Sequence, residues 1–333
     1  MTKNRICDLL GIKYPIIQAP MNWISGADMV AAVSNAGCLG TLGINAGART
    51  ISNDPGIIAE RLREQVRKVR GLTQKPFAVN IVIGFDEGRK FSERCLHVLL
   101  EEKVAIVVCT VGSPEVYTGM LKDAGIKVLH AVSNVTHADK AERSGVDAVI
   151  CEGYEAGGHK GFDELTTFTL VPMVADSVKI PVIAGGGVTD ARGVAAALAL
   201  GADGVYMGTR FMASRESDAH LNIKEAIIKS GDTSTVSLRH FGMLCRNLKN
   251  IYTKIYLDMI ASGATDEELR EFHNEYSFFH TQTTGDTEVG EIICGQGAGL
   301  IKSAPGAAEI IEAIVSDISV VMAKCQDKLG CFQ

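Results

Sequence analysis

The residues best suited to chemistry lie in a glycine-rich loop with one histidine, Cys151-Glu152-Gly153-Tyr154-Glu155-Ala156-Gly157-Gly158-His159-Lys160-Gly161. The loop follows an apolar run, Asp147–Ile150, that reads as a buried strand. Gly157 and Gly158 allow the backbone to adopt positive φ angles and to lie flat against a ligand, while histidine titrates near neutrality. The loop is therefore either a flexible turn with an incidental surface histidine or one edge of a catalytic site that uses His159.

Two later loops point to a phosphate site. Gly185–Gly187 end one apolar run, and Met207–Thr209 end the next. Successive loops of this kind often bind phosphate in barrels, because small residues expose backbone N–H groups and a short helix adds positive potential at its N-terminus. Gly185–Gly187 alone also fits a tight turn into a helix, with Asp190 as the helix N-cap. The two loops together, in this order, favour phosphate binding.

Two polar residues interrupt other apolar runs. Asn80 stands within Ala78–Val82, and because buried amides must be hydrogen-bonded, it either ties two strands together or faces a ligand, which is the interpretation we favour. His130 is predicted to point into the same site. No pair of histidines has the helical spacing and carboxylate companion of a metal site, so no transition metal is predicted.

A scaffold must bring these loops together. Apolar runs rich in Val and Ile recur along the chain without polar alternation, which is typical of parallel strands covered on both faces. Segments of helical character, such as Ala27–Asn35, Ile58–Val69, Pro114–Ala124 and Thr136–Ser144, separate them. Eight such units favour an α/β fold of the (β/α)8 TIM barrel type over an open doubly wound sheet. The eight runs are Tyr14–Met21, Cys38–Leu42, Phe77–Ile83, Ala105–Val111, Lys127–Val132, Ala148–Cys151, Pro181–Ala184 and Gly204–Gly208.

Beyond Phe211 the alternation of strand-like and helical segments stops. The next segment is polar and helical in character, and no strand is expected in it. We therefore predict a barrel over residues 1–216, a mainly helical lid that binds substrate over 217–294, and a C-terminal part over 295–333 that returns to the barrel. The helices predicted here are Leu221–Ser230, Gly242–Ser262, Thr265–Tyr276 and the final Gly306–Lys324.

Composition excludes several classes of protein. The 333 residues are 46% hydrophobic and 22% charged, which is typical of a globular protein, and a net charge of −6 argues against nucleic acid as a partner. The start of the chain lacks the apolar region of a signal peptide, and no apolar run reaches the length of a membrane span, so a cytoplasmic location without membrane contact is expected. Nine scattered cysteines without a Cys-x-x-Cys pair are expected to be reduced and buried.

Together, these motifs make the chain similar to the flavin-dependent nitronate monooxygenases, formerly called 2-nitropropane dioxygenases, and to their relatives, the FMN-containing enoyl-ACP reductases II and NADH:quinone reductases. The resemblance extends almost from end to end. It is carried by Gln18–Met21, Asn35–Gly37, Pro76–Asn80, Glu152–His159, Pro181–Gly187, Gly208–Phe211 and Gly295-Gln296.

The resemblance implies FMN at the mouth of the barrel and a homodimer. His159 falls on the family's catalytic histidine. The substrate contacts we predict are Trp23, His130 and Gln296. The predicted cofactor-binding residues are Ala19, Pro20, Met21, Asn80, Glu152, Gly157, Gly185, Gly186, Gly187, Met207, Gly208 and Thr209.

Some positions depart from the family pattern. Glu152 stands where nitronate monooxygenases commonly have glutamine, Tyr206 likewise replaces a frequent glutamine, and Cys38 replaces a usual glycine. Other features look more like the enoyl reductases. These are Met21-Asn22-Trp23, Leu165–Val171, His240-Phe241-Gly242 with Arg246, and Gly285–Glu288.

The expected activity is therefore NADH- or NADPH-dependent reduction of an enoyl thioester, with acyl carrier protein as a possible carrier of the acyl group. His159 would protonate Cα or polarise the thioester carbonyl. The alternatives are oxidation of a nitronate with O₂ and reduction of a quinone. A protein of a different class, a flavin-binding barrel without catalytic activity, would keep the phosphate loops but would not need His159.

Overall fold

Eight parallel strands form a nearly closed barrel in the computed structural model, which describes residues 4–84, 89–240 and 242–332. The strand order is β1-β9-β8-β6-β5-β4-β3-β2. The ends of this sheet meet where the Gln18 N–H donates to the Leu39 carbonyl at 2.9 Å and the Leu39 N–H donates to the Ile16 carbonyl at 3.0 Å. The predicted TIM barrel is thus confirmed. Its strands are β1 Ile16–Gln18, β2 Gly40–Leu42, β3 Phe77–Val82, β4 Ile106–Thr110, β5 Lys127–Val132, β6 Ala148–Glu152, β8 Val182–Gly185 and β9 Gly204–Met207.

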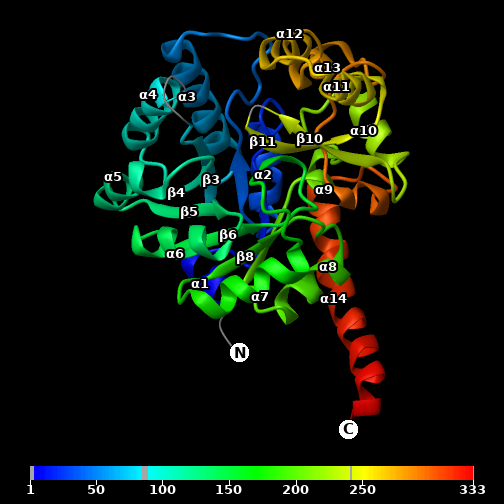
Figure 1. The fold of residues 1–333 in the computed structure, drawn as a ribbon. Helices are drawn as coiled ribbons and strands as arrows, with labels where there is room; N and C mark the ends of the chain where they lie inside the picture. The colour runs from blue at the N-terminus through cyan, green and yellow to red at the C-terminus, as the bar shows by residue number, and fades with distance from the viewer. Residues whose placement is uncertain (1–3, 85–88, 241, 333) are drawn as a thin grey trace.

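Helices surround the strands, as Figure 1 shows. Local signals fix several of their starts: the Asp54 side chain accepts hydrogen bonds from the Gly56 and Ile57 N–H groups, with Pro55 at the first helical position. Asp190 caps the helix after β8, as predicted. The helices are α2 Ala27–Asn35, α3 Pro55–Leu72, α4 Arg89–Glu101, the 3-10 turn η2 Pro114–Val116, α5 Thr118–Asp123, α6 Val135–Arg143, α7 Thr167–Ser177, α8 Ala191–Ala199 and α9 Thr209–Met212.

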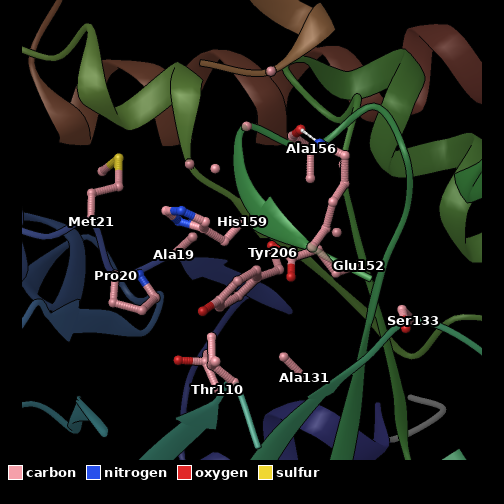
Figure 2. A pocket seen from close by; sticks show the side chains of 18 of the residues that line it. Ala19, Pro20, Met21, Thr110, Ala131, Ser133, Glu152, Ala156, His159 and Tyr206 are labelled. Carbon is pink, nitrogen blue, oxygen red and sulfur yellow. Dashed lines mark hydrogen bonds between the residues drawn. The ribbon is translucent and has the colours of Figure 1, made fainter. Parts of the chain in front are cut away.

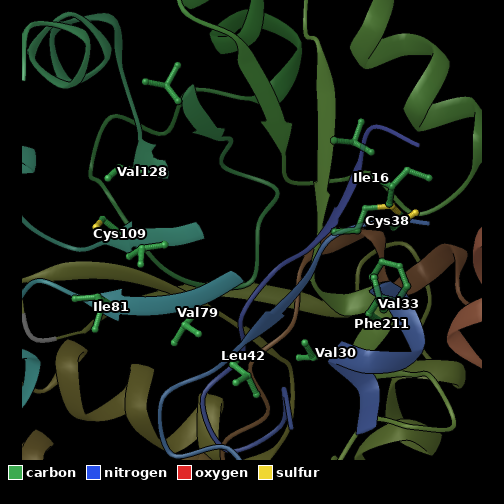
Figure 3. Packing of buried hydrophobic residues seen from close by; sticks show 14 of the residues in the cluster. Ile16, Val30, Val33, Cys38, Leu42, Val79, Ile81, Cys109, Val128 and Phe211 are labelled. Atoms are coloured by element: carbon green, nitrogen blue, oxygen red, sulfur yellow. The ribbon is translucent and has the colours of Figure 1, made fainter. Parts of the chain in front are cut away.

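The barrel strands separate two hydrophobic cores. Alternate strand residues such as Val79, Ile81 and Val128 face the helices and form the large outer core (Figure 3). Their neighbours fill the barrel interior, where helix α1 (Arg5–Leu10) adds Ile6 and Leu10. Because α1 packs into this interior core, the open space of the barrel lies at the carboxyl ends of the strands, where barrels place their sites.

A second unit, which we call the cap, covers that end of the barrel (Figure 1). It contains a three-stranded antiparallel sheet of order β10-β11-β7. Strand β7 comes from the loop after β6, so the barrel chain itself contributes one strand of the cap sheet. The cap elements are β7 Gly158–Lys160, α10 Leu221–Ile228, β10 Thr235–His240, β11 Met243–Leu248, α11 Ile251–Ala261, α12 Asp266–Tyr276 and α13 Phe278–Thr284.

The expectation of an uninterrupted helical lid is wrong. The range Gly242–Ser262, predicted as one helix, is strand β11 followed by helix α11, and Thr235–His240 is also a strand. Helix α11 begins only after Asn250, whose side chain accepts from the Thr253 N–H in a capping box. The strand before it is stabilised by pairing with β10 and β7, a tertiary interaction that overrides local helical character.

The chain ends with a 3-10 turn, η3 (Gln296–Leu300), helix α14 (Ala307–Leu329) and a last turn, η4 (Gly330–Phe332). Helix α14 packs against α2 and α8 and then extends past the barrel (Figure 1). Within the ranges that the structure describes, no helix has the length and apolarity of a membrane span. Cys325 and Cys331 are exposed, which departs from the expectation that the cysteines are buried.

Candidate active site

A cavity of about 610 Å³ lies between the carboxyl ends of the barrel strands and the cap. Its volume is in the range typical of cofactor and substrate sites. Figure 2 shows side chains from several separate loops around this one space. The sequence-predicted residues that line it are Ala19, Pro20, Met21, Asn80, His130, Glu152, Gly157, His159, Gly185, Gly186, Gly187, Gly208 and Thr209.

Three predicted residues lie elsewhere. The Met207 side chain is packed in the outer core at 1% exposure, and only its carbonyl approaches the site by accepting from the Ala19 N–H at 2.9 Å. The Trp23 ring packs on Phe279, with 4.5 Å between ring centroids. The Gln296 side chain is exposed, while its backbone N–H donates to the Glu155 carbonyl. The structure does not bring these three side chains to the cavity wall.

One side of the cavity, which we call the glycine wall, consists of Gly185–Gly187, Thr189, Gly208 and Thr209. Gly186 has a φ of 100°, and a Cβ there would lie 3.1 Å from the Gly153 carbonyl oxygen. The hydroxyl oxygen of Thr189 is buried and has no hydrogen-bond partner among the described residues. Close-packed backbone and an unpaired hydroxyl are a suitable surface for a phosphate group.

The floor of the cavity is polar. Both N–H groups of the Asn80 amide are used, because Nδ2 donates to the Val108 carbonyl at 2.9 Å and to Thr110 Oγ1 at 3.1 Å. Asn80 therefore ties β3 to β4, as one interpretation of the sequence proposed, and its amide oxygen remains the group able to accept from a ligand. Tyr206 crosses the floor beside Gly185, where a Cβ would lie 3.3 Å from the Tyr206 ring.

Glu152 ends strand β6 beside Tyr206 (Figure 2). Burial raises the pKa of this carboxyl to about 7, although the Lys160 cation opposes the rise. Burial, and then the Glu152 charge, raise the pKa of the Tyr206 phenol far above its usual value. At neutral pH the floor therefore holds a neutral phenol, which is able to donate a hydrogen bond, and a carboxyl that is part protonated.

His159 lies on β7, opposite Cys245 of β11, and lines the cavity between Met21 and Tyr206 (Figure 2). The preceding loop is held in place because the Glu155 carboxylate accepts from the Thr167 N–H at 2.8 Å and from the Thr167 hydroxyl at 3.0 Å. Burial, and then the Lys160 charge, lower the pKa of the imidazole. His159 is therefore neutral near pH 7 and can donate one ring N–H to a ligand.

His130 reaches the cavity only at its rim. It alternates with Leu129, which fills the barrel interior, and shares its strand face with Val128 and Val132 of the outer core. Burial lowers its pKa to about 4, opposed by a hydrogen bond with the Gly112 backbone. The ring is thus neutral, and it lines the cavity from the strand face that it shares with Val128 and Val132.

Sequence reasoning did not assign a role to Lys160, Thr189 or Arg246. Lys160 is 6% exposed, yet lines the cavity, and its Nζ donates to the Ala156 carbonyl at 3.1 Å. Arg246 comes from the same face of the cap sheet and lies over the Tyr154 ring, 4.6 Å from its centroid. Polar and apolar residues alternate in Thr235–His240, which could have identified a strand there. Its pairing partners in the sheet carry the two buried cations, Lys160 and Arg246.

The roof of the cavity is apolar. It consists of cap residues together with side chains from the loops around β1 and β9, and it faces the polar floor. No group of three or more potential metal ligands occurs in the described part of the chain. The roof residues are Ile24, Met212, Met243, Phe278 and Ile293.

Comparison with known proteins shows the family of the chain. Residues 3–90 and 82–317 match the family model described as nitronate monooxygenase. A probable nitronate monooxygenase from Staphylococcus aureus (strain MSSA476) is 31% identical over 361 aligned residues, which cover 96% of this chain and 98% of the relative.

Two solved structures share the fold and the length. FabK from Thermotoga maritima has a TM-score of 0.88 at 37% identity, with 98% of this chain and 100% of that chain covered. Nitroalkane oxidase from Streptomyces ansochromogenes has a TM-score of 0.81 at 26% identity, with 96% and 99% covered. The chain belongs to the nitronate monooxygenase family and is a flavin-dependent oxidoreductase.

Proposed function

We propose that the protein is an FMN-dependent reductase of enoyl thioesters that uses NADH or NADPH. The observation that carries this proposal is the division of the cavity into a polar floor with a glycine wall and an apolar roof. The polar part suits a phosphorylated flavin, and the apolar part suits an acyl chain. The similarity in sequence and length to FabK, at 37% identity, supports the same assignment.

The residues present fit FMN. The glycine wall would hold its phosphate, with the unpaired Thr189 hydroxyl as one donor. Ala19–Met21, Asn80 and Glu152 would border the ring, since they line the remaining sides of the same cavity. When bound, FMN accepts a hydride from a nicotinamide and supplies one to a carbon acceptor.

The role of His159 follows from its protonation state. A neutral imidazole is a weak acid, so its ring N–H is better suited to hydrogen-bond the thioester carbonyl than to give up a proton. That hydrogen bond would draw electrons from the double bond and make Cβ a better acceptor of hydride. The apolar roof would exclude water from the same space.

Oxidation of a nitronate is the second candidate, because the matched family model and the Staphylococcus aureus relative carry that name. The glycine wall and His159 would serve either reaction. A small nitronate, however, does not require a roof of five apolar side chains.

Anaerobic rapid mixing tests the proposal. The FMN-loaded protein is mixed with NADH, NADPH or an alkyl nitronate while the oxidised flavin absorbance is followed. We expect a nicotinamide to bleach the flavin absorbance. The absorbance should then recover when a crotonyl-type thioester is added, but not when a quinone is added. Bleaching by the nitronate with both nicotinamides inert would overturn the proposal in favour of the second candidate.

A further inference from the structure

A small second pocket of about 10 Å³ lies beside the main cavity. It is large enough for about one water molecule. The side chains of Ser133, Glu152 and Lys160 border both spaces, and the exposed Glu164 borders the small one. The small pocket therefore lies between residues of the main cavity and the exposed Glu164.

Glu152 and Lys160 face each other across this pocket without direct contact. No ion pair within 4.0 Å joins them in the parts of the chain that the structure describes. Lys160 Nζ instead donates to the Ala156 carbonyl and lies 5.5 Å from the centroid of the Tyr154 ring. An ammonium group has three donors, so Lys160 can also donate to a water in the pocket, and Glu152 can share that water.

Both groups exchange protons near neutral pH. Burial and the Arg246 charge lower the pKa of Lys160 to about 8, while Glu152 and Glu155 oppose this change. The pKa of Glu152 is about 7. The other titratable groups that influence the pair are His159 on β7, Cys245 on β11 and Tyr206 on β9. A proton can therefore move between the two groups at little cost in free energy.

We propose that Glu152 and Lys160 form a proton relay, through one water in the small pocket, that delivers protons from solvent to the floor of the active site. The proposal rests on the proposed function. Reduction of an enoyl thioester breaks the C=C π bond and forms a C–H bond at Cβ from the hydride and one at Cα from a proton, while NAD(P)H is oxidised to NAD(P)⁺. One proton must enter per turnover, and a neutral His159 does not readily supply it. Glu152 releases this proton into the cavity, Lys160 reprotonates Glu152 through the water, and solvent at the Glu164 side reprotonates Lys160.

The test isolates the half-reaction that consumes the proton. FMN-loaded wild type, Glu152→Gln, Lys160→Met and Lys160→Ala are reduced anaerobically with dithionite and mixed with a crotonyl-type thioester between pH 6 and 9. Lys229→Met is the matched control, because Lys229 is exposed at the C-terminal end of α10 and its one ion pair among the described residues is with Glu225. FMN affinity and the flavin absorbance spectrum are measured for every variant.

We expect the Glu152 and Lys160 variants to slow flavin reoxidation at least about tenfold, since a positioned proton donor raises a reaction rate by roughly 10²–10⁴-fold. The solvent deuterium isotope effect should rise in Lys160→Met, and methylamine should restore part of the rate in Lys160→Ala. In the Lys160 variants, FMN affinity and the flavin spectrum should stay at wild-type values, which a merely structural role of Lys160 would not predict.

Two failures are distinguishable. If wild type is reoxidised by the thioester and the Lys160 variants match it in rate, isotope effect and pH profile, the relay is wrong and the proposed function stands. If wild type itself is not reoxidised by the thioester, the proposed function is wrong and the relay is rejected with it.

Discussion

The two sides of the cavity are built in different ways. The glycine wall presents backbone and hydroxyl groups, whereas a neighbouring set of residues, Glu152, His159, Lys160 and Tyr206, presents titratable side chains and is called the side-chain wall here. In the side-chain wall, burial is the largest cause of every pKa shift. The glycine wall has no group that titrates near neutral pH.

In the proposed function, the glycine wall binds the cofactor and the side-chain wall carries out the chemistry. A backbone surface recognises a fixed group such as phosphate and tolerates few substitutions, because an added Cβ meets other backbone atoms. A wall of buried titratable side chains can change its reactivity through one substitution without altering the fold. The proteins similar to this chain are named for nitronates, for nitroalkanes and as FabK, which is consistent with a fixed cofactor wall and a variable chemical one.

The largest expected effect is on turnover when the side-chain wall loses His159. His159→Ala should lower the rate of substrate turnover by about 10²–10⁴-fold, the usual contribution of a positioned proton-transfer or hydrogen-bonding group. FMN affinity should change little, because the glycine wall is intact. Steady-state kinetics and a flavin titration of the same preparation measure both quantities.

His97→Ala is the matched control, since His97 is exposed on α4, outside the cavity. Its turnover should equal that of wild type. If His159→Ala retained wild-type turnover with every acceptor, His159 would have no catalytic role, and the contrast between the two walls would no longer hold.

The eight barrel strands could be predicted from the sequence, with limits within about three residues of those in the structure. The run Lys127–Val132 and the helix Ala27–Asn35 have the predicted limits. Such elements are specified locally, by continuous apolar runs, helical spacing and caps such as Asp190. The loops at the strand ends were recognisable for the same reason, because glycines and a lone histidine stand out against apolar strands.

The cap and some side-chain directions could not be predicted in this way. Strand β11 forms because it pairs with its sequence neighbour β10 and with β7, which lies more than 80 residues earlier in the chain. Met207 and Tyr206 are neighbours on β9, so a shift of one residue decides which of them faces the cavity. The sequence alone does not show the register of β9, which turns Tyr206 rather than Met207 toward the cavity.

Burial is also expected to control the charge of Glu291, which lies behind the side-chain wall. Glu291 in the cap is 1% exposed, accepts from the Phe278 N–H, and lies 4.0 Å from the sulfur of Cys245, the residue paired with His159. Burial raises its pKa to about 7. The neighbouring His273 has its pKa lowered to about 4 by burial and so does not compensate the charge.

Because the folded pKa of Glu291 lies above its ordinary value, the folded state binds the extra proton. The stability from this proton is complete below about pH 4.5 and is lost as the pH rises through about 7, a change of roughly 3 kcal/mol in the free energy of unfolding. Glu291→Gln should therefore match wild type at pH 5 and unfold at a higher temperature at pH 8. Thermal unfolding at both pH values, with the exposed Glu275→Gln as control, measures this. A Glu291→Gln protein less stable than wild type at pH 8 would contradict it.

The third prediction concerns the backbone geometry of the glycine wall. Gly186→Ala places a Cβ 3.1 Å from the Gly153 carbonyl oxygen at a φ of 100°, which costs about 1–3 kcal/mol if the loop keeps its shape. Without FMN the loop can relax, so the cost should appear mainly as FMN affinity weakened by about 10–100-fold. Flavin fluorescence titration measures the affinity. Gly119→Ala in α5, where an added Cβ meets no atom within 4 Å, should bind FMN like wild type.

The smallest expected effect is the change in FMN affinity on removing one group of the glycine wall, the hydroxyl of Thr189. The Thr189 hydroxyl is buried and unpaired in the part of the chain described, and Thr189→Val replaces it with a methyl group of similar size. If this hydroxyl donates to the FMN phosphate, its loss should weaken FMN binding by about tenfold, equivalent to a hydrogen bond to a charged group of about 1.5 kcal/mol. The variant should also be slightly more stable than wild type without FMN, since an unsatisfied buried hydroxyl is costly. Equal FMN affinity in both proteins would place the phosphate away from Thr189 and confine its contacts to Gly185–Gly187, Gly208 and Thr209.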